Sequence, residues 1–172
     1  MRLRRPHRSD GSSMCGLVRA CPPLDVNSVY AYLLLAEHFP ETCVLAEDDE
    51  GLSGLVTGYL PQARSDTLFV WQVAVAGRAR GLGLGCRMLR ALVERPQLSR
   101  VRYIETTVGP DNQASRRMFA RLARGLRAST AESAFFDAAM FGAGNHGAEP
   151  LLRIGPFEMP AAAGGVGESP AR

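Results

Sequence analysis

The sequence predicts a fold of the α/β (α+β) class, in which one mixed β-sheet carries helices on both faces. The strand expected at 68–75 alternates β-branched residues, and it leads into the glycine-rich turn 81–85 and an amphipathic helix. A second strand, 103–108, is also followed by a helix, and the acidic turn 47–51 joins two strands as a hairpin. Strands that alternate with helices, together with a hairpin, favour a mixed sheet that is covered on both sides.

In the first half of the chain, the pattern predicts a strand around 17–19 and a helix over 27–38. Asp25 or Asn27 is expected to cap this helix, because both side chains accept hydrogen bonds from free backbone N–H groups. The two hairpin strands are expected at 43–46 and 52–59. One helix and three strands are therefore expected before residue 60.

In the second half, the helix after the glycine turn has one apolar and one charged face, and Pro96 ends it. The apolar face consists of Leu84, Met88, Leu89 and Leu92. A Gly-Pro turn precedes the next helix, which Asp111 or Asn112 can cap. A short strand is expected around 151–154, and no internal repeat is visible.

Length and composition predict a single domain. At 172 residues, of which 46% are hydrophobic, the chain can bury a sizeable core. We expect a flexible basic arm at 1–10, the folded domain at 11–158 and a disordered glycine-rich tail at 159–172. No apolar run approaches the roughly 20 residues that span a bilayer, and the basic start lacks the apolar stretch of a secretory signal. A cytoplasmic protein without a membrane partner is therefore expected.

The cysteines and histidines predict neither a metal site nor a disulfide. They are Cys15, Cys21, Cys43, Cys86, His7, His38 and His146. No C-x-x-C pair occurs, and no histidine stands at ligand spacing from a cysteine. We therefore expect reduced thiols and no metal.

The glycine-rich turn is suited to binding phosphate. Gly81, Gly83 and Gly85 let the backbone approach a ligand without an intervening Cβ, and they allow positive φ. A turn that opens a helix also presents free N–H groups, which bind pyrophosphate. The alternative is a strand–turn–helix connection whose glycines serve packing alone. A second motif downstream favours phosphate binding.

Arg80 is followed by glycines three and five residues further on, and this Arg-x-x-Gly-x-Gly pattern resembles the acyl-CoA loop of the GCN5-related N-acetyltransferases (GNATs). The resemblance implies the GNAT fold, acetyl-CoA as cosubstrate and acetyl transfer to an amine. It also implies that the cofactor contacts Val73, Val75, Arg80, Gly81, Leu82, Gly83, Leu84, Gly85, Asn112 and Ser115.

The second motif, 105–119, is similar to the same superfamily. The resemblance implies that Asn112 contacts the pantetheine arm and that Ser115 lies near the cofactor. Many members carry a tyrosine seven residues after this asparagine, and it protonates the departing CoA thiolate. Here Phe119 occupies that position and has no proton to give, so the usual general acid is missing there.

Further segments narrow the resemblance to the L-2,4-diaminobutyrate γ-N-acetyltransferases of ectoine biosynthesis. They are 21–47, 58–61, 66–73, 105–112 and 149–154, and the resemblance spans about residues 10–155. It implies acetylation of the γ-amine of L-2,4-diaminobutyrate, which gives N4-acetyl-L-2,4-diaminobutyrate, a step in the synthesis of an osmoprotective compatible solute. Because members are commonly homodimers, the apolar region 135–141 is expected either at a dimer interface or in the core.

Diaminobutyrate carries a carboxylate and two ammonium groups, so its site requires acidic side chains. The acidic candidates are Asp25, Glu105 and Glu149. A carboxylate such as Glu105 in mid-strand either points to solvent or pairs with an amine, and the resemblance turns it towards the gap where acetyl-CoA inserts. Thr107 lies on the same face of the strand as Glu105, where it is either a substrate contact or a core residue. Trp71 is either a core residue or a wall of the acceptor pocket.

We expect direct transfer within a ternary complex. An amine of this kind titrates near pH 10.4, so a base must first remove a proton. Glu105 or Asp25 is the expected proton acceptor, directly or through water, although Asp25 has the alternative role of a helix cap. The backbone N–H of Val73 or of a neighbour would polarise the thioester carbonyl.

Three alternatives remain open from the sequence. The chain could acetylate another amine, such as a polyamine, an antibiotic or a protein, or it could bind acetyl-CoA without catalysis. A nucleic-acid role is disfavoured, because the arginines after Asn112 lack interleaved aromatic residues. These arginines either meet the 3′-phosphate of CoA or form a solvated helix face.

Overall fold

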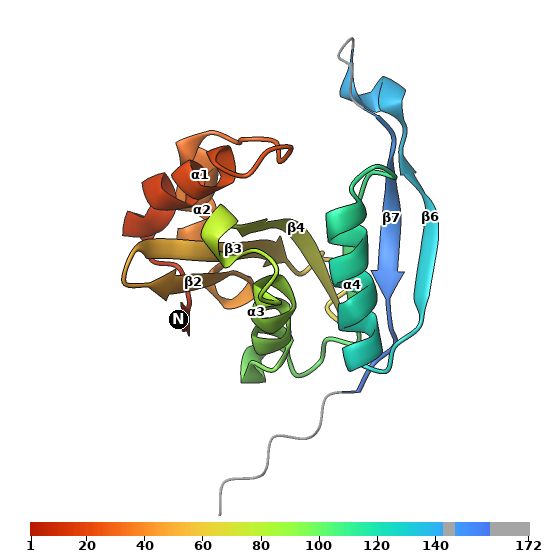
Figure 1. Cartoon of the computed structure of the whole chain (residues 1–172). Helices are drawn as coiled ribbons and strands as arrows, with labels where there is room; N and C mark the ends of the chain where they lie inside the picture. Colours follow the sequence, from red (N-terminus) through yellow and green to blue (C-terminus); the bar gives the residue numbers. More distant parts are fainter. Residues whose placement is uncertain (143–146, 159–172) are drawn as a thin grey trace, which may run out of the picture.

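The computed structural model describes residues 1–142 and 147–158, and within them seven strands form one mixed sheet (Figure 1). The strand order is β1-β2-β3-β4-β5-β7-β6, and every neighbouring pair is antiparallel except β4 with β5. The strands are β1 (Arg2–Arg4), β2 (Val44–Asp48), β3 (Gly51–Tyr59), β4 (Thr67–Val75), β5 (Tyr103–Thr107), β6 (Thr130–Phe136) and β7 (Glu149–Ile154). The expected fold class, a mixed sheet with helices on both faces, is confirmed.

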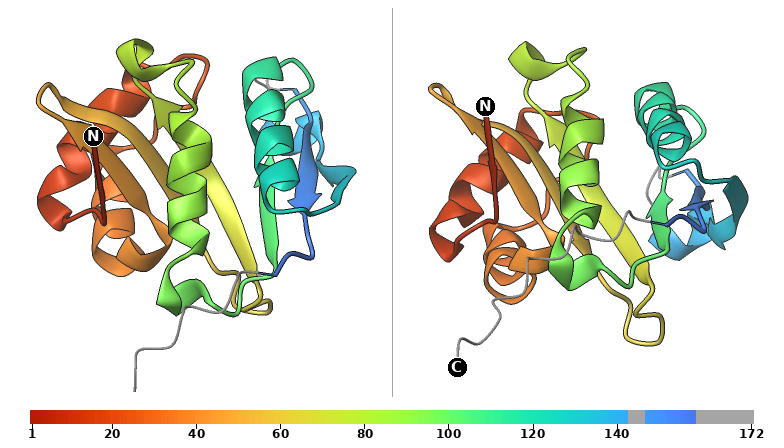
Figure 2. Two further views of the ribbon diagram at one scale, coloured as in Figure 1. Left: turned by 60° about the horizontal axis from the view of Figure 1, so that its bottom comes forward. Right: turned by 90° about the horizontal axis from the view of Figure 1, so that it is seen from below.

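Within the described residues, four α-helices are present. Helices cover both faces of the sheet (Figure 2). They are α1 (Gly11–Arg19), α2 (Val29–His38), α3 (Leu84–Val93) and α4 (Gln113–Gly125). Short 3₁₀ turns occupy Arg8–Asp10, Pro40–Thr42, Gly77–Ala79, Pro96–Leu98 and Ala138–Phe141. The first two helices pack on one face and the last two on the other, so the sheet lies between two hydrophobic cores.

The larger core lies under α3 and α4. Met88, Leu89 and Leu92 of α3 are fully buried, as the apolar face of this helix predicts, and they pack near Leu68 and Ile104 of the sheet. Full burial of each such side chain contributes about 1.5–3 kcal/mol, so this face fixes α3 against the sheet. The start of α3, which carries the glycine turn, is thereby held beside β4.

The central strands β4 and β5 form a fork. They pair only over residues 67–69 and 103–105, and beyond Phe69 and Glu105 they share no register. Trp71 is an extra residue in β4, because Gly58 pairs with Val70 while the adjacent Thr57 pairs with Gln72. This β-bulge bends the strand where the fork opens.

The bulge also exchanges the two faces of β4. Before it, Leu68 and Val70 belong to the core under α3 and α4. After it, Val73 and Val75 pack towards that core, whereas Ala74 belongs to the core under α1 and α2. Even-numbered residues of β4 thus face α3 and α4 before the bulge, and they face α1 and α2 after it.

The expected strand at 17–19 is wrong, because these residues end helix α1. Met14, Leu17, Val18 and Cys21 are all buried, and their spacing of three, four and seven residues is that of one helix face. The three residues 17–19 are too short a segment to reveal this longer period.

The expected loose arm at 1–10 is also wrong. Arg2–Arg4 form the edge strand β1, which pairs with β2. Arg4 forms ion pairs with Asp10 at 2.7 Å and Glu47 at 2.9 Å, so the basic residues that suggested a solvated arm attach this segment to the sheet.

Several other boundaries differ from expectation. Ser28, not Asp25 or Asn27, caps α2, and its hydroxyl accepts a hydrogen bond from the N–H of Ala31 at 3.3 Å. Strand β6 was not expected, and β7 starts at Glu149 rather than at 151. The hairpin of β2 and β3, the strands β4 and β5, and the helices α3 and α4 are confirmed. The tail expected at 159–172 lies outside the described residues.

Candidate active site

The glycine turn has the backbone conformation that its composition predicts. Gly81 and Gly83 adopt φ of 79° and 73°, in the left-handed region that side chains disfavour. Gly83 is the N-cap of α3, and no side chain caps this helix. Its first N–H groups are therefore available to an anionic ligand, and the helix dipole favours negative charge there.

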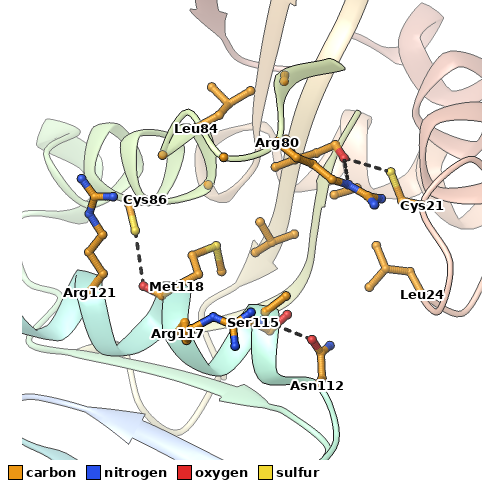
Figure 3. A pocket seen from close by; sticks show the side chains of 18 of the residues that line it. Cys21, Leu24, Arg80, Leu84, Cys86, Asn112, Ser115, Arg117, Met118 and Arg121 are labelled. Atoms are coloured by element: carbon orange, nitrogen blue, oxygen red, sulfur yellow. Dashed lines mark hydrogen bonds between the residues drawn. The ribbon is translucent and has the colours of Figure 1, made fainter. Parts of the chain in front are cut away.

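A cavity of about 510 Å³ lies beside this turn, between β4 and α4 (Figure 3). Four segments line it: the loop after α1, the end of β4, the glycine turn with the start of α3, and the start of α4. The expected cofactor residues that line it are Val73, Val75, Arg80, Gly81, Gly83, Leu84, Gly85, Asn112 and Ser115. Leu82 does not line it and is 77% exposed, because it sits at the tip of the turn.

The backbone of β4 turns polar groups towards the fork. The carbonyl of Val75 accepts hydrogen bonds from Cys21 Sγ at 3.3 Å and from Arg80 Nε at 3.1 Å, so it points away from β3. The N–H of Ala76 instead donates to Ser53 of β3 at 2.9 Å. Because alternate residues of a strand direct their backbone groups to the same side, the N–H of Val73 also points into the fork.

Gly85 of α3 packs against the Met118 side chain of α4 at the cavity. A Cβ at this position would lie 2.3 Å from Met118 Sδ. The sequence predicted that this glycine allows close approach of a phosphate, and the structure adds a packing reason. Asn112 caps helix α4, since its Oδ1 accepts a hydrogen bond from the N–H of Ser115 at 3.1 Å.

Several cavity residues were not expected from the sequence. They are Cys21, Pro22, Pro23, Leu24, Ala74, Ala79, Cys86, Ala114 and Met118. Helical spacing offered one usable signal, because Met118 lies three residues after Ser115. Arg117 and Arg121, two of the arginines considered for the 3′-phosphate of CoA, also line the cavity. Cys86 donates to the carbonyl of Met118 at 3.3 Å, and burial raises the pKa of its thiol.

The other side of the fork is a polar face on β5 and β7. Ile104 of β5 and Ile154 of β7 are buried in the core under α4, so their neighbours in sequence face the opposite side. The residues of that face are Tyr103, Glu105, Thr107, Glu149, Leu151 and Arg153. Thr107 Oγ1 donates a hydrogen bond to Glu149 Oε2.

Glu105 neither points to solvent nor stands alone. Its side chain is 1% exposed, and its Oε1 forms ion pairs with Arg64 Nη1 at 2.6 Å and with Arg153 Nη1. The Arg153 guanidinium lies 3.8 Å from the ring centroid of Tyr103. Glu105 Oε2 is buried and has no hydrogen-bond partner within the described residues. The expectation of an amine partner is thus corrected in part, because two guanidinium groups pair with this carboxylate.

A third group of residues ties the loop after α1 to β4. Gln72 Nε2 donates to the carbonyl of Asp25 at 2.7 Å, and Gln72 Oε1 accepts from the Tyr32 hydroxyl at 3.1 Å. Gln72 and Tyr32 are both buried, and neither was expected at the site. Trp71, next to Gln72, is 44% exposed and is therefore not a core residue.

Phe119 lies in the hydrophobic core and is 2% exposed. The position at which many GNATs carry the tyrosine that protonates the CoA thiolate is thus filled by a buried apolar side chain. Over residues 1–142 and 147–158, no group of three or more histidine, cysteine or acidic residues could hold a metal ion. In the same part of the chain, no helix is long and apolar enough to cross a membrane.

The model of the acetyltransferase (GNAT) family matches residues 12–123. The chain therefore belongs to the GNAT family of acetyltransferases. Among curated relatives, L-2,4-diaminobutyric acid acetyltransferase of Bordetella parapertussis is 56% identical over 92% of this chain and 86% of its own length. The same enzyme of Chromohalobacter salexigens is 49% identical over 91% of this chain and 81% of its own. Within GNATs, the chain thus belongs with the L-2,4-diaminobutyric acid acetyltransferases.

Solved structures agree with this assignment. Diaminobutyrate acetyltransferase EctA from Paenibacillus lautus, in complex with its substrate L-2,4-diaminobutyric acid and coenzyme A, is 39% identical and matches with a TM-score of 0.88. The match covers 94% of this chain and 98% of that one. Naa20 of Chaetomium thermophilum matches with a TM-score of 0.68 at 15% identity, which shows a common fold.

Proposed function

We propose that this protein transfers the acetyl group of acetyl-CoA to the γ-amine of L-2,4-diaminobutyrate, forming N4-acetyl-L-2,4-diaminobutyrate as a step of ectoine biosynthesis. The observation that carries the proposal is the fork itself. A phosphate-binding turn and a cavity of about 510 Å³ lie on one side of it, and a polar face that holds the buried carboxylate of Glu105 lies on the other. The identity of 56% to a relative of that activity supports the choice of amine.

The cavity fits coenzyme A. Gly81 and Gly83 leave the N–H groups at the start of α3 uncovered for the pyrophosphate. Asn112 and Ser115 line the same cavity, where the resemblance places the pantetheine arm. The N–H of Val73 is directed into the fork and would donate a hydrogen bond to the thioester carbonyl, which stabilises the oxyanion as it develops.

The polar face fits an amino acid with two ammonium groups. Glu105 and Glu149 supply carboxylates on neighbouring strands, and Asp25 belongs to the loop that Gln72 ties to β4. Thr107 and Trp71 complete the proposed acceptor residues. The γ-ammonium must lose its proton before it attacks, and we assign this proton to Asp25 or Glu105, directly or through water. A thiol of pKa near 8.5 is a tolerable leaving group without protonation, so Phe119 is no obstacle.

The test is turnover of acetyl-CoA with L-2,4-diaminobutyrate, measured as the CoA thiol that is released. Lysine, ornithine and spermidine are assayed in parallel. Selective release with diaminobutyrate is the expected result. Release with another amine alone would keep the cofactor site and refute the proposed acceptor, and CoA binding without release for any amine would refute catalysis.

We further propose that the protein is a cytoplasmic homodimer. Each residue of β6 is exposed, and Phe135, Phe136 and Phe141 cluster at the end of the β6–β7 hairpin, which extends beyond the body in Figure 1. Aromatic clusters of this kind are typical of interfaces. The four cysteines are free, which fits a reducing compartment. Light scattering of the protein and of Phe136→Asp tests the dimer, and a monomeric parent protein would refute it.

A further inference from the structure

Two arginines from distant parts of the sequence converge on one oxygen of Glu105. Arg64 lies in the loop between β3 and β4, and Arg153 lies on β7 in register with Glu105. Both guanidinium groups pair with Oε1, although a carboxylate offers two oxygens. An arrangement that served only to neutralise Glu105 would use both oxygens, as bidentate pairs do.

The other oxygen, Oε2, is buried and has no partner among the described residues. A buried carboxylate oxygen without a hydrogen bond is unfavourable, because it has lost water and gained no donor. The side chain as a whole is 1% exposed, so bulk water does not compensate. An unpaired group of this kind in a native fold marks the place of a missing donor.

The position of Glu105 indicates where that donor comes from. Glu105 is the last residue of β5 that pairs with β4, opposite Phe69, so it lies where the fork begins to open. Thr107, two residues further on the same face, is bonded to Glu149. Oε2 is therefore the unsatisfied acceptor at the base of the acceptor side.

We propose that Arg64 and Arg153 are positioning residues, which hold Oε1 of Glu105 so that Oε2 accepts a hydrogen bond from an ammonium group of the acceptor. The inference rests on the proposed function, since it takes the acceptor to be a diamino acid. Arg153 is the more firmly held of the two, because its guanidinium stacks on Tyr103 and its backbone belongs to the sheet. Arg64 comes from a loop, and its side chain is 41% exposed.

The alternative use of the two arginines is direct contact with the substrate carboxylate. The two roles differ in their dependence on Glu105. A positioning residue acts through Glu105, so its removal adds nothing once the Glu105 carboxylate is gone. A residue that binds the substrate directly contributes independently, and its effect adds to that of Glu105.

The experiment compares Arg153→Met, Arg153→Lys, Glu105→Gln and the double variant Arg153→Met with Glu105→Gln. We expect Arg153→Met to raise the KM for diaminobutyrate about tenfold or more, with the KM for acetyl-CoA unchanged, and Arg153→Lys to recover part of the loss. The double variant should match Glu105→Gln alone. Arg102→Met is the matched control, because Arg102 directly precedes β5, the strand of Glu105, and its guanidinium forms a 3.9 Å surface pair with Glu158.

Arg64→Met gives a second, independent reading from an exposed loop, should Arg153→Met fail to fold. A wild-type KM for diaminobutyrate in Arg153→Met or in Arg64→Met would overturn the inference, and so would additive effects in the double variant. An equal rise in both KM values would reduce the arginines to a structural role and overturn it too. The proposed function fails separately, if the unaltered protein releases no thiol with diaminobutyrate.

Discussion

The two sides of the β4–β5 fork are built in different ways. The cofactor side centres on the glycine turn, with its backbone N–H groups, and the end of β4, the loop after α1 and the starts of α3 and α4 surround it. The acceptor side centres on side chains that meet from the β3–β4 loop, β4, β5 and β7. The first side depends on local backbone conformation, whereas a site made of converging charges depends on each partner. Substitutions should therefore separate the two sides by which KM they change.

The largest effect should come from Glu105→Gln. The variant keeps the shape of the side chain but removes the charge that pairs with Arg64 and Arg153 and, in the proposed complex, with an ammonium group of the acceptor. We expect kcat/KM for diaminobutyrate to fall about 100-fold or more, with the affinity for CoA unchanged. Calorimetric titration with CoA and steady-state kinetics measure the two quantities.

Glu132→Gln is the control for this prediction, because Glu132 also pairs with an arginine, Arg116, but lies on exposed β6. It should leave both KM values unchanged. If Glu105→Gln and Asp25→Asn both kept full turnover at saturating substrate, neither carboxylate could be the base.

The next largest effect should fall on the cofactor side. In Gly85→Val, the Cβ would lie 2.3 Å from Met118 Sδ, so the Met118 side chain must shift and the added methyl groups enter the cavity that both residues line. We expect the KM for acetyl-CoA to rise about tenfold to 100-fold, since misplacement of about 1 Å has effects of that size. The KM for diaminobutyrate should change less.

Gly77→Ala is the matched control, because a Cβ at Gly77 meets nothing within 4 Å. Gly85→Val combined with Met118→Ala should recover part of the affinity for acetyl-CoA. A loss that the second substitution failed to relieve would show that Gly85 acts through its contact with the ligand and not through its contact with Met118.

The difference between the two sides also explains what the sequence could predict. The glycine turn and the cap at Asn112 are local patterns, in which neighbours in sequence form the structure, and both were predicted correctly. Strand β6 and the contact of Arg64 and Arg153 with Glu105 depend on pairing between distant segments. The bulge at Trp71 is of the same kind, since it exists only in relation to the register of β3.

Gln72 is expected to act on the acceptor side alone, with a smaller effect. Gln72→Leu removes two hydrogen bonds, one to the carbonyl of Asp25 and one from Tyr32. The loop after α1, which contains Asp25, thereby loses its attachment to β4. We expect the KM for diaminobutyrate to rise severalfold and the free energy of unfolding to fall by about 1–3 kcal/mol. Chemical denaturation and kinetics measure both, with Gln113→Leu as the control, because Gln113 is an exposed glutamine at the start of α4. An unchanged KM despite lower stability would show that the tether does not shape the acceptor side.

The smallest effect should lie outside the fork, in the N-terminal segment. Arg4 donates hydrogen bonds to Asp10 at 2.7 and 2.9 Å and lowers the pKa of this carboxyl below its ordinary value. The stabilisation that results is present above the unfolded pKa of about 3.9 and is lost as pH falls through the lower pKa of the folded state. Because the pair is partly exposed, we expect Asp10→Asn to cost about 1 kcal/mol or less at pH 7 and to flatten the loss of stability below pH 4. Thermal melts across pH 2–7 measure this, and both KM values should stay at wild type. A change in either KM would mean that β1 is coupled to the fork through β2 and β3, and the separation between scaffold and site would not hold.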